Sequence, residues 1–149
     1  TQGNGSGFGD NGSNNNGNNP DDNDDNNDDT PVSNNLKITI GPVSFNATLE
    51  NNETAKAFKR LLPMTVDMSE LHGNEKYYYL SNGLPTASSN PGTIRTGDLM
   101  LYGSTCVVLF YETFSTSYTY TRLGRITNPS GLASTLGSGG VNVTFEITD

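Results

Sequence analysis

Apolar and polar residues alternate along several short stretches between residues 36 and 149, and this pattern predicts β-strands. The first two stretches, LKITI at 36–40 and VSFNATLE at 43–50, flank Gly41-Pro42. Alternation of period two on both sides of a turn-forming pair predicts a β-hairpin with one buried face. The last stretch, VNVTFEIT at 141–148, alternates in the same way and predicts a strand that ends the domain.

The middle of the chain contains the most apolar sequence. Leu99–Tyr102 and Cys106–Tyr111 are joined across Gly103-Ser104 and predict two central strands. The aromatic run at 77–80, YYYL, favours a further strand, and SYTYTRLGRI at 117–126 alternates as another. Residues 81–97 hold several Pro and Gly and few apolar side chains, which predicts a long exposed connection.

Two short segments have the spacing of helices. Asn52 offers an N-cap for ETAKAFKRLL at 53–62, which Pro63 ends, and SGLASTLG at 130–137 ends at Gly137. About seven strands and two short helices predict a mainly β fold. We expect a small closed β-barrel, because closure leaves no long strand edge exposed.

Residues 1–35 have a different composition, with Phe8 and Val32 as their large apolar residues and with recurring Gly, Asn and Asp. Ordering a backbone costs roughly 1–2 kcal/mol per residue, which such a segment cannot recover by burial. We therefore expect a disordered acidic tail at 1–35 and one domain at 36–149. The tail holds seven of the sixteen acidic residues and no Lys or Arg, so the domain is nearly neutral despite the chain's formal charge of −8.

These compositions exclude several partners and suggest a location. A nucleic-acid partner is not expected without a clustered basic surface, and no apolar run is long enough for a membrane-spanning helix. A Gly/Asn/Asp spacer is typical of the stalk of an exported protein, which predicts an extracytoplasmic protein at the cell envelope or surface, lipid-anchored before Thr1. A solubility tail or a linker from a longer protein has the same composition.

Few residues suggest catalytic or metal chemistry. His72, the one histidine, falls in the polar turn SELHGNEK, and Cys106, the one cysteine, begins an apolar strand and is expected in the core. Asp22, Asp24 and Asn26 have the spacing that opens a calcium loop, but the sixth position holds Asn27 where glycine is needed. We therefore predict no catalytic constellation, no metal site and no cofactor.

An ordered set of motifs resembles the bacterial cyclophilin-like fold proteins. It consists of the first hairpin, then AFKRLLP, EKYYYL, GDLMLYG, CVVLFY and RLGRI, and it covers nearly all of residues 36–149. The resemblance implies a barrel related to the peptidyl-prolyl isomerases, which bind an X-Pro segment in a groove on the outer surface. True cyclophilins carry an Arg in a strand of the form FHRxxxxFMxQGG, whereas the nearest stretch here, YYYLSNGLP at 77–85, has none. The enzymatic status therefore stays open.

The aromatic residues of the late strands are candidates for lining such a groove. We predict a ligand-binding floor with one cation at its rim, formed by Tyr102, Phe110, Tyr118, Tyr120 and Arg122. The competing interpretation is that Phe110 and Tyr102 pack inward as core.

The leading function is a tethered module that binds a peptide or a small apolar ligand. The alternatives are a peptidyl-prolyl isomerase with a rearranged site and a structural or adaptor domain of a surface assembly. The sequence determines neither the ligand nor the oligomeric state.

Overall fold

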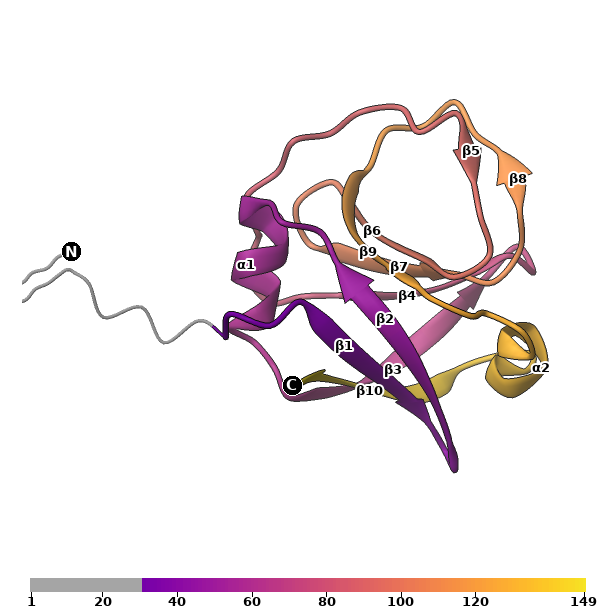
Figure 1. Ribbon diagram of the computed structural model, residues 1–149. Coiled ribbons are helices and arrows are strands. Elements are labelled where there is room, and N and C mark those ends of the chain that lie inside the picture. Colours follow the sequence, from indigo (N-terminus) through magenta and orange to yellow (C-terminus); the bar gives the residue numbers. More distant parts are fainter. Residues whose placement is uncertain (1–30) are drawn as a thin grey trace, which may run out of the picture. The chain divides into compact units, whose positions relative to one another are not determined.

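Eight antiparallel strands close into a barrel in the computed structural model, which describes residues 31–149 (Figure 1). Around the barrel the order is β1-β10-β3-β4-β7-β6-β9-β2, and β5 (Thr93–Ile94) pairs with β8 (Phe114–Ser115) in a separate two-stranded sheet. The predicted mainly β closed barrel with two short helices is confirmed. The barrel strands are β1 (Asn35–Ile40), β2 (Val43–Leu49), β3 (Met64–Leu71), β4 (Glu75–Tyr79), β6 (Asp98–Tyr102), β7 (Cys106–Phe110), β9 (Thr121–Ile126) and β10 (Val141–Thr148).

The two helices begin and end close to where the sequence predicts. The side chain of Asn52 caps α1 (Glu53–Lys59) by accepting a hydrogen bond from the Ala55 N–H at 2.7 Å. Helix α2 (Leu132–Leu136) ends at Gly137, whose φ of 69° suits a residue without a side chain. The first helix buries Phe58 against Phe145 of β10, with ring centroids 5.7 Å apart.

Two apolar clusters lie on opposite faces of the central strands. The larger cluster fills the barrel and takes the inward residues of every barrel strand, such as Leu99, Leu101, Val107 and Leu109. The smaller cluster covers the outer face of the same strands, and its buried members are Ile94, Met100, Cys106, Val108, Phe110 and Tyr120. Strands β6 and β7 are therefore buried on both faces, which explains why they are nearly continuous apolar runs.

The connection between β4 and β6 is mostly exposed, as predicted, but it also holds a short strand that the sequence did not indicate. It contains β5 (Thr93–Ile94), which pairs with β8 (Phe114–Ser115), and Ile94 is fully buried in the outer cluster. Ser89 also exchanges backbone hydrogen bonds with Tyr120. This pairing holds the connection against the outside of the barrel (Figure 1).

The disordered tail was predicted for residues 1–35, and the structure describes its last five residues. Residues 1–30, which include the calcium-like Asp22–Asn26 fragment, lie outside the described residues. Asn35 begins β1, and the carbonyl of Asn34 accepts a hydrogen bond from the Leu49 N–H at 2.8 Å. Within residues 31–149, neither helix is long or apolar enough to cross a membrane.

Candidate functional site

A pocket on the outer face of the barrel is built by the alternation of three neighbouring strands. In β4, Glu75, Tyr77 and Tyr79 share the outward face, while Lys76 and Tyr78 point the other way. The register pairs Tyr79 with Cys106 and Tyr77 with Val108 of β7, and it pairs Cys106 with Tyr102 of β6. Cys106 and Val108 thus form a floor between tyrosines of two adjacent strands.

The segment between β8 and β9 adds two further tyrosines. Tyr120 is buried, and its backbone is held by the two hydrogen bonds to Ser89. Its ring lies 5.5 Å from that of Tyr102, and the ring of Tyr118 lies 6.1 Å from the same Tyr102 ring in an edge-on arrangement. These contacts make a connected aromatic wall above the strand floor.

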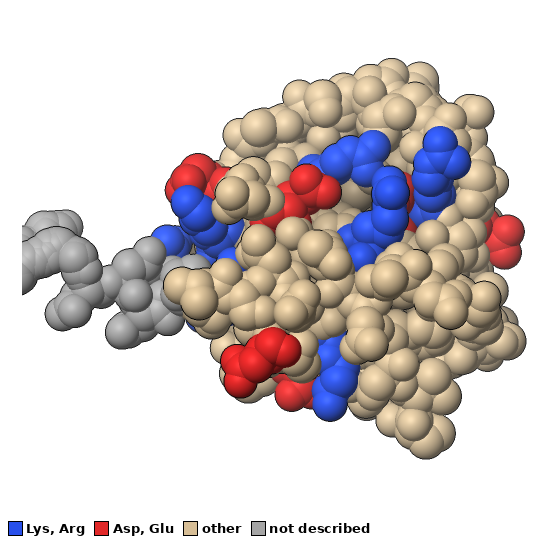
Figure 2. Space-filling model, viewed as in Figure 1, with Lys and Arg blue, Asp and Glu red and all other residues tan. Residues whose placement is uncertain are grey.

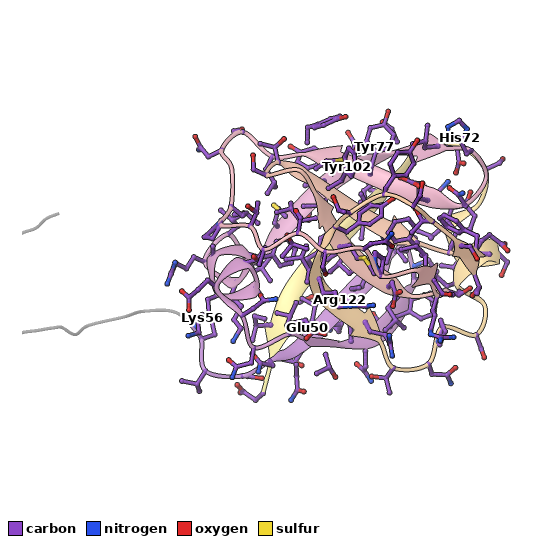
Figure 3. The ribbon with its side chains drawn as sticks, turned by 90° about the horizontal axis from the view of Figure 1, so that it is seen from above. Glu50, Lys56, His72, Tyr77, Tyr102 and Arg122 are labelled. Atoms are coloured by element: carbon purple, nitrogen blue, oxygen red, sulfur yellow. The ribbon has the colours of Figure 1, made fainter. Side chains whose placement is uncertain are left out.

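The resulting cavity has a volume of about 370 Å³, which is within the usual range for sites that bind small molecules. Figure 3 shows Tyr77, Tyr102 and His72 along the same edge of the barrel. We call this cavity the tyrosine pocket. Its lining residues are Leu71, His72, Glu75, Tyr77, Tyr79, Tyr102, Cys106, Val108, Tyr118 and Tyr120.

Glu75 gives the tyrosine pocket a carboxyl group. Burial raises the pKa of Glu75, the nearby His72 lowers it by a smaller amount, and Glu70 adds slightly to the rise. Among residues 31–149, the Glu75 carboxylate takes part in neither a hydrogen bond nor an ion pair. Glu75 therefore faces the pocket with His72 nearby and with no Lys or Arg among the lining residues.

Glu70, another acid of the β3–β4 hairpin, has the opposite environment. It accepts hydrogen bonds from the Lys76 ammonium at 2.9 Å, the Tyr111 hydroxyl at 2.6 Å and the Gly73 N–H at 2.6 Å. Burial would raise the pKa of Glu70, but these three donors together hold it below its usual value. The charge of Glu70 is thus used within the fold, whereas that of Glu75 is not.

The remaining polar groups of the pocket do not form a nucleophilic site. Burial and then the charge of Glu75 raise the pKa of the Cys106 thiol to about 11, so it stays protonated at neutral pH. Cys106 is buried in the outer cluster, as predicted for a core residue. His72 is exposed in the β3–β4 turn with a φ of 55°, and the structure gives it no hydrogen bond to Cys106.

The structure brings together three of the five residues predicted to bind ligand. Tyr102, Tyr118 and Tyr120 line the tyrosine pocket. Phe110 is fully buried beneath it, with its ring 5.5 Å from that of Tyr120, so it supports the wall without lining the cavity. Arg122 is not a lining residue, and Figure 3 shows it away from Tyr77 and Tyr102.

The arginines belong to another part of the surface. Figure 2 shows basic side chains, with acidic ones beside them, on the face of the barrel viewed there. Arg125 of β9 pairs with the buried carboxylate of Asp98, Nε to Oδ1 at 3.1 Å, and the other oxygen of Asp98 accepts from the Arg95 N–H. Asp98 thus holds the turn before β6.

Sequence reasoning missed the other seven lining residues, which are Leu71, His72, Glu75, Tyr77, Tyr79, Cys106 and Val108. The signal for part of this set was present, because Glu75, Tyr77 and Tyr79 recur at every second position and must share one face of a strand. What the spacing does not show is that β4 lies beside β7.

Metal binding has no support in the described part of the chain. Between residues 31 and 149, no three His, Cys, Asp or Glu side chains gather in a way that could hold a metal ion.

The described part of the chain is a closed β-barrel domain with a pocket on its outer face. Residues 38–146 match the Cyclophilin-like family, and the chain belongs to it. The solution structure of a hypothetical protein from Archaeoglobus fulgidus is similar, with a TM-score of 0.54 and 19% identity over 78% of this chain and 96% of that one. At this identity the likeness concerns the fold. No curated protein matches the chain.

Proposed function

We propose that this cyclophilin-like domain is a ligand-binding module whose tyrosine pocket takes a small molecule or the side chain of a peptide. The observation that carries the proposal is where the exposed apolar side chains gather. Within residues 31–149 seven large apolar side chains are exposed, and four of them, Leu71, Tyr79, Tyr102 and Tyr118, line this one cavity. Such a concentration of apolar surface around a hollow is typical of a binding site.

The pocket combines a firm base with an open entrance. Val108 is buried in the floor, and Phe110 fixes Tyr120 from beneath. Tyr79 and Tyr118, at 64% and 62% exposure, can cover a ligand that enters. Aromatic rings supply a large contact area with few rotatable bonds, so ordering them on a ligand costs little entropy.

The test is an NMR titration of the full-length chain with four small probes: benzyl alcohol, 3,3-dimethylbutan-1-ol, choline and benzoate. We expect at least one to shift the amide signals of Tyr77, Cys106 and Tyr102 in a saturable way. The double substitution Tyr102→Ala with Tyr118→Ala should remove these shifts. Leu61→Ala is the matched control, because Leu61 is an exposed apolar residue outside the pocket.

The proposal fails if none of the four probes gives saturable shifts at the pocket, or if the shifts persist in the double variant. Either result would instead favour a structural or adaptor domain.

The isomerase alternative has weaker geometric support. Isomerisation needs a group that stabilises the twisted amide over the planar one, and no Lys or Arg is among the residues that line the tyrosine pocket. We expect no turnover in a protease-coupled prolyl-peptide assay. Robust turnover that is lost in Arg122→Ala would overturn this conclusion.

We further propose that the module is exported and tethered at the cell envelope through its N-terminal segment. The support is composition alone: residues 1–30 are rich in Gly, Asn and Asp and contain no Lys or Arg. Cell fractionation with an antibody against the domain tests this, and recovery of the protein in the cytoplasmic fraction would refute it.

A further inference from the structure

Glu75 and the tyrosines around it offer a carboxylate and several aromatic faces to the same cavity. We propose that the tyrosine pocket takes an organic cation, an ammonium group whose nitrogen carries alkyl substituents. This inference rests on the proposed ligand-binding function and names the chemistry of the ligand. Glu75 would act as the counter-ion, and the rings of Tyr77, Tyr102 and Tyr120 as the surrounding cage.

The charge balance of the lining selects the sign of the ligand. Glu75 is the only acid among the ten lining residues, and neither Lys nor Arg is among them; His72, exposed in the adjoining turn, is their one basic side chain. The phenols of Tyr79 and Tyr120 stay neutral, because Cys106 and then burial raise the pKa of Tyr79, while burial and then Glu75 raise that of Tyr120. The Glu75 carboxylate would repel an anion, whereas a cation would pair with it.

The aromatic rings add a second attraction for a cation. The face of a tyrosine ring carries negative charge density, and an alkylated ammonium placed against several such faces is held without hydrogen bonds. Tyr77 and Tyr79 contact edge-on at 5.7 Å on the β4 side. Tyr102, Tyr118 and Tyr120 form the connected group across the floor.

The buried ammonium group of Lys76 shows how many hydrogen-bond acceptors a primary ammonium uses in this domain. Lys76 Nζ is completely buried and is satisfied by the Glu70 carboxylate and by two backbone carbonyls, those of Gly137 and Gly139, with the Tyr111 ring 5.3 Å away. The tyrosine pocket has a carboxylate and rings but lies over β4, β7 and β6, each paired on both sides. Because those backbone carbonyls are engaged in the sheet, a cation with few N–H groups fits better.

Choline and 3,3-dimethylbutan-1-ol separate charge from shape, because the alcohol replaces the nitrogen of choline by carbon. In an NMR titration of the full-length protein, we expect choline to bind at least tenfold more tightly than 3,3-dimethylbutan-1-ol. A peptide with one trimethyl-lysine and neutral flanking residues forms a third arm. If this peptide binds more tightly than choline, the natural ligand is a cationic side chain of another protein. If choline binds more tightly, the natural ligand is a free small molecule.

Substitutions test the two parts of the site separately. Glu75→Gln should weaken choline binding about tenfold and weaken the alcohol less. Glu112→Gln is the matched control, since Glu112 is an exposed carboxylate after β7 that does not line the pocket, and it should leave choline binding unchanged. Tyr102→Leu should weaken choline binding, whereas Tyr102→Phe, which keeps the ring, should retain it.

Two results would overturn the inference. Equal or tighter binding of the neutral alcohol would show that the pocket selects shape and not charge, and it would leave the ligand-binding function intact. An unchanged choline affinity in Glu75→Gln would remove Glu75 as the counter-ion. If neither cationic probe binds while benzyl alcohol or benzoate does, the cation is likewise refuted, separately from the function.

Discussion

Replacing Lys76 by Met tests the account of how the barrel tolerates a buried charge. Lys76 is 0% exposed, and its ammonium group joins Glu70 of β3 to the carbonyls of Gly137 and Gly139, which lie between α2 and β10. Met keeps much of the length and apolar character of the side chain but removes the charged head. The substitution therefore removes the Lys76 ammonium as a hydrogen-bond donor to the carbonyls of Gly137 and Gly139 and to the Glu70 carboxylate.

The expected cost follows from the burial of each partner. Removing one member of a buried ion pair costs about 3–5 kcal/mol, and Glu70, at 25% exposure, can recover some hydration. We therefore expect the free energy of unfolding to fall by about 3 kcal/mol. For a domain of this size, that corresponds to a fall of about 12 °C in Tm.

Urea and thermal unfolding, followed by circular dichroism, measure the effect. Lys37→Met is the control, because Lys37 pairs with Glu146 at 3.9 Å with a side chain that is 40% exposed, and such pairs contribute little. A loss below about 0.5 kcal/mol for Lys76→Met, equal to the control, would refute the reasoning.

The pH dependence gives an independent check. Because the folded-state pKa of Glu70 is depressed, its ionisation stabilises the fold above the usual pKa of 4.5. This contribution should be lost as the pH falls through the lowered folded-state value. In Lys76→Met, the largest of the three hydrogen-bonding influences on Glu70 is gone, so this acid-dependent loss should be smaller.

Three further predictions concern the pocket and the barrel wall. Choline binding should weaken as the pH falls from neutral through the raised pKa of Glu75, because protonation removes the carboxylate charge that pairs with the cation. Affinity measured between pH 4 and 7.5 checks this, and a flat profile contradicts it. Cys106 should react with iodoacetamide at pH 7.5 more slowly than free cysteine, because burial raises the pKa of its thiol to about 11. Mass spectrometry follows the reaction, and rapid alkylation of the folded protein would contradict the burial of Cys106. Gly124→Ala should lower the free energy of unfolding by about 1–3 kcal/mol, because the added methyl group would meet the backbone oxygen of Thr48 at 2.6 Å. An unchanged midpoint of urea unfolding would show that β9 and β2 can move apart without loss of stability.

Local sequence signals predicted most of the elements. Alternation predicted β1, β2 and β10, and the Asn52 cap and Gly137 predicted where α1 begins and α2 ends. Strand β3 was not predicted explicitly, although Met64, Val66 and Met68 recur every second residue. Strands β5 and β8 have two residues each and exist because they pair with each other, so no local pattern could predict them.

The candidate site was predicted only in part, for a similar reason. The late tyrosines Tyr102, Tyr118 and Tyr120 were named from their sequence neighbourhood. Phe110 and Arg122 were predicted to join them, but Phe110 is buried in the outer cluster and Arg122 does not line the pocket. Whether any of these residues binds ligand stays a prediction that the titrations above address.

The sequence by itself determined which side chains share a face, because strand geometry alternates them with a fixed period of two. It thereby placed Glu75 with Tyr77 and Tyr79, and Cys106 with Val108. Only the tertiary structure decided that β4 lies beside β7 and that the segment carrying Tyr118 and Tyr120 crosses their outer face. Backbone hydrogen bonds between strands are the same for almost any sequence, so strand order depends on barrel closure and on the burial of both apolar clusters at once.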